Sequence, residues 1–338
     1  MRILRKTLLT ASAVLLAATG AGTAQAAAPH EAARAATPPP VAGATSAFNA
    51  VDNSTDAGAA STAYWTPERM RKAIPLDSVP SAARPGAASL DAEVVGRPFS
   101  VPPLQAAPAK AAGPAAVPYA TVNASAAAGK VFFKDPKDGR NYVCSASALN
   151  SSSRQLVVTA GHCVHGGRGG KWMTNWVYAP KYSNGRAPYG VFAAKQFRTF
   201  NSWITSSSFA RDVAMVTTWP LNGRKLGNVT GSHGISVNYD RTQAVYVLGY
   251  PSNRYQGEVQ MYCNGGTSAE RGSKRLQIRC RFGPGSSGGP WLRKYNTRTG
   301  LGYVNTVMST WNPSTGWNQA PYFDEYVTKL YKAQGPVT

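Results

Sequence analysis

From residue 130 onward, hydrophobic and polar positions alternate in short runs that are separated by Gly, Asn, Ser and Pro. These runs predict ten or more strands with little helix between them: KVFF, NYVCSASAL, QLVVTA, WVYAP, GVFAAKQFRTF, DVAMVTT, AVYVLGYP, VQMYC, LQIRC and GYVNTVMSTW. Many short strands with turn residues between them favour an antiparallel barrel or sandwich. We therefore predict one all-β domain over residues 129–338.

Helix periodicity is clear near the C-terminus, in the sequence NQAPYFDEYVTKLYKAQ. Its apolar residues recur at spacings of four, five and eight: Tyr322, Phe323, Tyr326, Val327, Leu330 and Tyr331. This spacing places them on one helix face, which can pack on the strands. The predicted fold class is all-β with a C-terminal helix.

The first residues are typical of a secretory signal peptide. Basic residues precede an apolar run over positions 8–18, and the sequence AQA at 24–26 has the small-x-small pattern of a cleavage site. The apolar run is shorter than the roughly 20 residues that a membrane helix needs, and no later stretch approaches that length. We expect residues 1–26 to be removed and the protein to be secreted, without a membrane span.

Residues 27–128 differ in composition from the rest of the chain. Fourteen of the 24 prolines lie before residue 130, whereas all four cysteines and seven of the eight tryptophans lie after it. Too little apolar content is present to offset the ordering entropy, so we predict a largely disordered segment. One piece, STAYWTPERMRKAIPL, suits a helix after Thr66-Pro67, because Thr favours the N-cap and Pro the first turn. The segment fits either a removable pro-region or a linker.

Positive charge is concentrated after residue 129. That part contains 26 Lys or Arg against eight Asp or Glu, which accounts for most of the net charge of +21. Such a charge attracts acidic polymers, either nucleic acid or an anionic cell surface. The basic residues form no long run, and no motif for reading bases is present. We expect no specific nucleic-acid partner, and an attraction to anionic cell-surface polymers stays open.

The chain has four cysteines: Cys144, Cys163, Cys263 and Cys280. An exported protein with an even number of cysteines should pair them in disulfides, and three pairings are possible. Joining neighbours closes two short loops, each worth on the order of 3 kcal/mol. The cluster of His162, Cys163 and His165 also suggests a metal site. We expect no metal, because export favours oxidised cysteine and no second ligand cluster completes the site.

His162 and Asp212 are the first candidates for chemistry. His162 follows the strand QLVVTA within TAGHCV, where a glycine and a cysteine constrain the backbone beside its ring. Asp212, in FARDVAMVTT, begins an apolar run, and buried aspartates are rare unless they are paired. By contrast, Asp135, Asp138 and Asp240 lie in turn-rich contexts and should be solvated. An imidazole beside a buried carboxylate suits a general base and the group that orients it.

The loop RFGPGSSGGP, residues 281–290, carries the candidate nucleophile. A serine nucleophile needs a nearby base and open backbone amides for the developing oxyanion. Ser287 fits best, since the amides of Gly285 and Ser287 can then point into one pocket. The loop also matches the G-x-S-x-G elbow, in which the base follows the serine. All four histidines precede Ser287, so that alternative is excluded.

Four motifs resemble those of chymotrypsin-like serine peptidases, nearest to secreted bacterial trypsin-like and glutamyl-endopeptidase-like enzymes: TAGHC, RDVAMV, LGYP and GSSGGPW. The chain order of histidine, aspartate and serine is also that of this class. The resemblance covers residues 129–338 and implies two six-stranded antiparallel β-barrels with the active site between them. It implies that His162 is the general base, Asp212 its orienting group and Ser287 the nucleophile, with oxyanion-hole amides from Gly285 and Ser287.

The resemblance also bears on the cysteines and on activation. It implies a disulfide from Cys144 to Cys163 that brackets the histidine, which leaves Cys263 to pair with Cys280. In animal members, an aspartate before the nucleophile pairs with a new N-terminal amine. Here that residue is Ser286, which cannot carry the charge. We hypothesise that activation does not depend on that ion pair.

Three residues are candidates for a specificity pocket: Arg281, Met308 and Ser309. Arg281 stands where members specific for basic residues carry an aspartate, which argues against a preference for Lys or Arg. It could attract an acidic side chain or point to solvent. Met308 stands where glutamate-specific members tend to carry a histidine. Residues 309–311 should form an exposed edge on which an extended substrate adds as a strand.

These features together predict a secreted serine endopeptidase, made as a zymogen, that hydrolyses extended peptides through an acyl-enzyme intermediate. We expect a monomer that needs no cofactor. Esterase activity is an expected side reaction of such a triad. The alternative from another class is an inactive peptidase-like module that binds anionic polymers through its basic surface.

Overall fold

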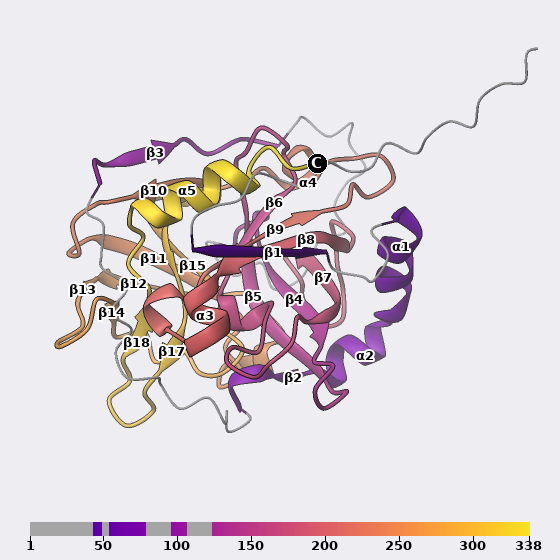
Figure 1. Cartoon of the computed structure of the whole chain (residues 1–338), viewed down its shortest axis with the longest axis horizontal. Helices are drawn as coiled ribbons and strands as arrows, with labels where there is room; N and C mark the ends of the chain where they lie inside the picture. The colour runs from indigo at the N-terminus through magenta and orange to yellow at the C-terminus, as the bar shows by residue number, and fades with distance from the viewer. Residues whose placement is uncertain (1–42, 49–53, 79–95, 107–123) are drawn as a thin grey trace, which may run out of the picture. The chain divides into compact units, whose positions relative to one another are not determined.

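The first half of the fold is a closed barrel of six antiparallel strands (Figure 1). The computed structural model describes residues 43–48, 54–78, 96–106 and 124–338, so the predicted signal peptide lies outside the described residues. Around the barrel, the strands are β4 (Ala128–Lys134), β5 (Asn141–Leu149), β6 (Leu156–Thr159), β9 (Ala214–Thr218), β8 (Phe192–Phe200) and β7 (Thr174–Pro180). A further strand, β1 (Ala44–Phe48), pairs with β8.

The second half consists of two sheets. In the order of pairing, the six-stranded sheet contains β12 (Met261–Gly266), β11 (Ala244–Gly249), β15 (Pro290–Asn296), β16 (Leu301–Val307), β10 (Gly234–Val237) and β3 (Phe99–Val101). The four-stranded sheet contains β13 (Ser268–Ala269), β14 (Leu276–Ile278), β18 (Asn318–Ala320) and β17 (Thr310–Trp311). β10 runs parallel to β16, which the sequence does not reveal because side chains alternate in both kinds of pairing.

The predicted C-terminal helix is confirmed as α5 (Glu325–Gln334). Its residues Val327 and Leu330 are buried in a cluster shared by the barrel and the six-stranded sheet. Asp324 caps the helix and also forms a buried ion pair with Arg211, Nη2 to Oδ2 2.8 Å. Two short helices in the predicted all-β domain were not expected, α3 (Asn201–Ser206) and α4 (Leu226–Thr230). Single turns complete the described domain at η2 (Gly161–Cys163), η3 (Phe209–Arg211) and η4 (Tyr255–Gly257).

Parts of the N-terminal segment are folded against the barrel. The segment forms α1 (Thr55–Tyr64), α2 (Pro67–Lys72), the two-residue strand β2 (Ile74–Pro75) and the turn η1 (Leu76–Ser78). The helix predicted after Thr66 is present, with the Thr66 side chain accepting a hydrogen bond from the Arg69 amide. We predicted a largely disordered segment over residues 27–128; its residues 27–42, 49–53, 79–95 and 107–123 lie outside the described part.

None of the helices in the described ranges combines the length and the apolar character that crossing a bilayer requires.

Candidate active site

The pairing of two barrel strands brings His162 and Asp212 together. In the ladder between β6 and β9, Thr159 lies opposite Ala214. His162 follows three residues after Thr159, in η2, and Asp212 lies two residues before Ala214. The two side chains therefore emerge at the same end of adjacent strands. His162 lines a cavity of about 850 Å³ that Ser287 also lines, and Asp212 lies behind the imidazole ring, 0% exposed.

Three hydrogen bonds hold the buried carboxylate of Asp212. Its Oδ1 accepts from the backbone N–H of His162 at 2.8 Å, and its Oδ2 accepts from His162 Nδ1 at 2.8 Å and from Ser309 Oγ at 2.6 Å. A carboxylate accepts only, so the His162 proton facing it is on Nδ1. The other ring nitrogen, Nε2, is left to face the cavity. Asp212 therefore fixes both the position and the tautomer of His162.

This arrangement gives Ser309 a different role from the predicted one. We expected Ser309 to be a specificity residue, but its side chain is buried and donates its hydroxyl proton to Asp212. The hydroxyl is therefore occupied with a carboxylate and is not free to select a substrate side chain. Ser309 is a positioning residue for Asp212. The sequence carried no signal for this contact, because the two residues are 97 positions apart.

The serine loop is held in place by two hydrogen bonds from Ser145 in the barrel. The Ser145 amide donates to the Ser287 carbonyl at 2.7 Å, and the Ser145 hydroxyl donates to the Gly285 carbonyl at 2.9 Å. At Gly288, whose φ is +80°, a Cβ would lie 2.1 Å from Thr159 Oγ1 and 2.2 Å from the Ser145 carbonyl oxygen. Only glycine allows this close approach. Gly288 thus allows the loop that carries Ser287 to lie directly against the barrel backbone.

A carboxylate from the N-terminal segment lies between His162 and Ser287. Ser287 Oγ donates to Asp77 Oδ2 at 2.6 Å, and the Gly285 amide donates to the same oxygen at 3.4 Å. Asp77 Oδ1 lies 3.1 Å from His162 Nε2, within ion-pair distance. Among the described residues, Ser287 makes no hydrogen bond to His162. The structure therefore brings the three predicted residues to one place, with the Asp77 carboxylate bound between His162 and Ser287.

The two carboxylates control the protonation of His162. Burial alone would lower the pKa of His162, but the charges and hydrogen bonds of Asp212 and Asp77 outweigh burial and raise its pKa to about 10. Burial alone would raise the pKa of Asp77, but its interactions with His162, Ser287 and the Gly285 amide lower it. In this arrangement the imidazolium and the Asp77 carboxylate stabilise one another at neutral pH.

Asp77 lies outside the domain in which we expected the site. The helix signal at Thr66-Pro67 indicated that this part of the segment folds, but nothing indicated that Asp77, eleven residues after Thr66, meets a serine 210 positions away. The sequence around a single aspartate in an Ala/Pro-rich stretch does not indicate which distant residue the aspartate contacts. Ser145 was likewise missed, since its local sequence is an ordinary strand.

Arg281 does not lie at the cavity. It is exposed, and its side chain runs along Gly316, where a Cβ would be 2.8 Å from Arg281 Cγ. Of the two alternatives that the sequence left open, the structure favours the one in which Arg281 points to solvent. Met308 does line the cavity, where it is almost fully buried. The cavity wall beside Ser287 comes from residues 283, 284, 286, 287 and 308–311, and none of these residues carries a charged side chain.

Charged residues line the cavity on the barrel side. Asp135, Lys137 and Asp138 come from the turn between β4 and β5, and Arg168 comes from the loop after η2. Asp138 is exposed and accepts a hydrogen bond from the Tyr142 hydroxyl at 2.5 Å. The predicted solvation of these turn aspartates agrees with their position, but their place beside the cleft was not foreseen.

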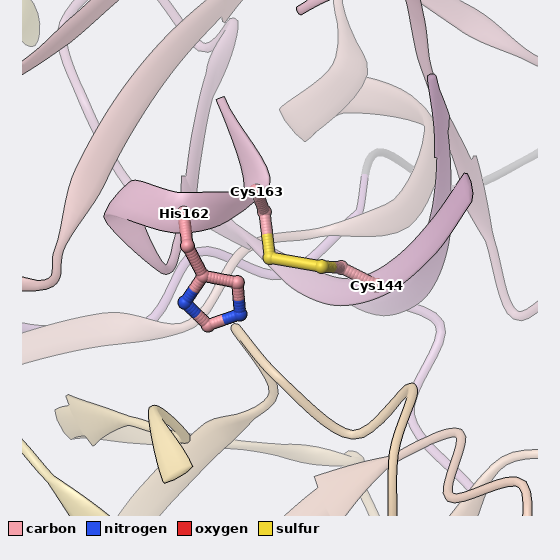
Figure 2. A group of neighbouring side chains, drawn as sticks. All are labelled: Cys144, His162 and Cys163. Carbon is pink, nitrogen blue, oxygen red and sulfur yellow. A yellow bond between two sulfur atoms is a disulfide. The ribbon is translucent and has the colours of Figure 1, made fainter. Parts of the chain in front are cut away.

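The cysteines and histidines near the site are not arranged for metal binding. Cys144 and Cys163 form a disulfide directly beside His162 (Figure 2). Since the two sulfurs are bonded to one another, neither is the thiolate that a zinc site requires. His165 packs against Trp172, and its Nδ1 accepts the Gly167 amide proton. The second predicted disulfide, between the neighbouring cysteines Cys263 and Cys280, is also present.

The arrangement has the parts needed for acyl transfer once the Asp77 carboxylate is displaced. Nε2 of His162 and the Ser287 hydroxyl both contact the Asp77 carboxylate, and Asp212 holds the other ring nitrogen. The Gly285 amide already donates to an oxygen held at the serine, which is the position that an oxyanion would require. The Ser286 hydroxyl, by contrast, is buried and donates to the Gly283 carbonyl at 2.7 Å. Ser286 therefore has its own partner within the loop.

The fold and the site define a chymotrypsin-like serine peptidase. The sequence matches the trypsin-like peptidase domain over residues 144–301. Among solved structures, the protease Anisep from Arthrobacter nicotinovorans is 32% identical, with a TM-score of 0.59, and the match covers 63% of this chain and 97% of that chain. The chain belongs to the trypsin-like serine peptidase family.

Two further structures agree with this assignment. The thermostable serine protease AL20 from an extremophilic microorganism is 31% identical, with a TM-score of 0.59, over 63% of this chain and 99% of that chain. A Glu endopeptidase shares the fold at 16% identity, with a TM-score of 0.51, over 64% of this chain and 94% of its own. The search of curated proteins returned no match.

The protonation of His162 can be measured directly in the intact chain. We expect its imidazole to titrate at about pH 10, while His233, whose pKa burial lowers, should titrate at about 3. Because the folded pKa of His162 lies above the ordinary 6.5, its charged form contributes stability below pH 6.5, and this contribution is lost as the pH rises through about 10. Long-range ¹H–¹⁵N NMR of the histidine rings reports both values.

The matched variant in that titration is Asp77→Ala, which should lower the pKa of His162 and leave His233 unchanged. His162→Gln assigns the signal. A wild-type pKa of His162 near the ordinary value would contradict the arrangement of the two carboxylates.

Proposed function

We propose that this peptidase is a secreted endopeptidase that uses His162, Asp212 and Ser287 as a catalytic triad. The observation that carries this proposal is the buried Asp212 carboxylate, which accepts two hydrogen bonds from His162 and leaves Nε2 facing the serine loop. A buried carboxylate that orients an imidazole toward a serine is the arrangement that serine peptidases use on several unrelated folds. The family assignment supports the same chemistry.

Each step uses groups that the site contains. As Ser287 Oγ forms a bond to the carbonyl carbon of the substrate, its proton moves to His162 Nε2. The Gly285 and Ser287 amides stabilise the oxyanion, and the protonated His162 donates its proton to the leaving amine as the C–N bond breaks. A water molecule then attacks the acyl-enzyme, with His162 again as base, and releases the acid and the free Ser287 hydroxyl.

The cavity suits an extended peptide substrate. β17 (Thr310–Trp311) is the last strand of its sheet, and both of its residues line the cavity. A free strand edge beside the nucleophile is a surface on which an extended chain adds through main-chain hydrogen bonds. This edge supports endopeptidase action on unfolded or looped segments.

Secretion is proposed from the signal-peptide features of residues 1–26, and residues 27–128 are proposed to be a pro-region that is removed from a zymogen.

Replacement of the triad residues tests the proposed catalysis. In the processed protein, Ser287→Ala should lower kcat by about 10⁶ and Asp212→Asn by about 10⁴, since the latter holds His162 in the wrong tautomer. The measurement is hydrolysis of a fluorogenic peptide, compared between preparations whose N-termini are the same by mass spectrometry. Asp240→Asn, at an exposed aspartate, is the control and should retain full activity.

Two outcomes would count against this function. Activity that survives in Ser287→Ala would exclude Ser287 as the nucleophile. A correctly folded, processed wild type without hydrolytic activity would instead favour the anionic-polymer module, which the net charge of +21 would then explain.

Substrate choice should depend on the neutral wall of the cavity and not on Arg281. We expect Arg281→Ala to leave the cleavage profile unchanged, because this side chain lies outside the cavity. Trp311→Ala should shift the profile toward larger side chains, since Trp311 lines the cavity and its removal adds volume. A peptide-library digest read by mass spectrometry checks both variants. A loss of preference for acidic residues in Arg281→Ala would overturn the assignment of the neutral wall.

A further inference from the structure

The segment of residues 54–78 binds the barrel through a small apolar interface. Trp65 caps the C-terminal end of α1, and Met70 lies in α2. They are 5% and 3% exposed and pack in a cluster with Phe132 of β4 and Tyr182, which follows β7. The rings of Trp65 and Phe132 are 5.4 Å apart, centre to centre. Large apolar side chains such as these supply the area that binds the segment to the barrel, and Ile74 and Leu76 also pack against the barrel core.

Polar contacts orient the same interface. The Trp65 indole N–H donates to the Asn175 carbonyl at 2.5 Å, and the Tyr64 hydroxyl donates to Asn141 Oδ1 at 2.9 Å. Both partners belong to barrel strands, β7 and β5. Buried donors are thus satisfied by the domain and not within the segment itself. The helices are therefore bound in one specific orientation.

The chain runs directly from these helices into the catalytic centre. α2 leads into β2, which pairs in parallel with Tyr142 and Val143 of β5 (Figure 1). Cys144, the next residue of β5, is joined to Cys163 beside His162. Only Leu76 separates β2 from Asp77, so the strand pairing determines where the Asp77 side chain lies. The pairing of the two residues of β2 with β5 is therefore sufficient to place the Asp77 side chain between His162 and Ser287.

Asp77 contacts three of the groups that would act on a substrate carbonyl. Its Oδ2 accepts from the Ser287 hydroxyl and from the Gly285 amide, and its Oδ1 lies 3.1 Å from His162 Nε2. The hydroxyl proton that His162 must accept is instead donated to the carboxylate. A carboxylate is resonance-stabilised and is not attacked by an alcohol, so this ligand is bound without being cleaved.

From this geometry we propose that the catalytic domain has a docking surface for residues 54–78 of its own chain, and that the Asp77 carboxylate is an inhibitory ligand of the catalytic centre. The helices supply binding and orientation, and the carboxylate blocks the base, the nucleophile and an oxyanion-hole amide together. The raised pKa of His162 agrees with this, because a protonated imidazole cannot act as a base. The inference rests on the proposed function and adds the mechanism by which the intact chain is held inactive.

The proposal is tested by the reactivity of Ser287 in the full-length chain. A fluorescent fluorophosphonate is added to the intact protein, and the labelling rate of the full-length band is read on a denaturing gel, so that any self-cleaved protein is excluded. We expect the wild type to react slowly, and Asp77→Ala and Asp77→Asn to react about 10- to 100-fold faster, because each loses charge-assisted hydrogen bonds to the centre. Glu68→Ala should react as slowly as the wild type.

Glu68 is a matched control, since it is an acidic residue on α2 of the same segment, and its carboxylate is exposed and pairs with Lys72 on its own helix. Asp77→Asn guards against a folding defect in Asp77→Ala, because it keeps the size of the side chain and removes the charge. Circular dichroism confirms that each variant is folded. Ser287→Ala combined with Asp77→Ala should abolish labelling and so identifies the reacting residue.

The possible results separate the inference from the function on which it rests. If the processed enzyme reacts quickly, but folded Asp77→Ala and Asp77→Asn react as slowly as the full-length wild type, the carboxylate is not the inhibitory ligand. A full-length wild type that reacts as fast as Asp77→Ala would overturn the proposal in the same way. If the processed enzyme does not react at all, the proposed peptidase function fails, and the inference fails with it.

Discussion

The buried carboxylate of Asp212 is the interaction on which the site depends. It accepts two hydrogen bonds from His162, which lies in the barrel, and one from Ser309, which follows β16 in the second half of the fold. A charge without exposure to water is tolerated only when such donors surround it. The requirement to satisfy this one group therefore brings both halves of the fold to His162, and the same contact places a proton on Nδ1 of the imidazole.

Ser287 is positioned by a second set of contacts that also joins the two halves of the fold. Ser145 in the barrel binds the carbonyls of Gly285 and Ser287, and Gly288 allows the loop to approach the barrel backbone. The cleft that results has a neutral wall beside Ser287 and charged residues on the barrel side. The β17 edge lies along this cleft, and the Asp77 carboxylate occupies the cleft between His162 and Ser287.

Much of the fold and the site could be predicted because the signals are local. The strands, the C-terminal helix and the motifs around His162 and Ser287 are each encoded within a few residues, and Asp212 was found from its apolar surroundings. Contacts over long separations could not be predicted. The bond from Ser309 to Asp212 depends on how the two halves meet, and the outward direction of Arg281 depends on its φ of +55° and on the space at Gly316.

The most direct test of the central claim is to map where a fluorophosphonate reacts in the processed protein. After reaction, digestion and mass spectrometry identify the modified residue within the peptide that contains Ser286 and Ser287. We predict a single adduct on Ser287 and none on Ser286, whose hydroxyl is already bonded to the Gly283 carbonyl. An adduct on any other residue, or no adduct on folded and processed protein, would contradict a nucleophile that His162 and Asp212 activate.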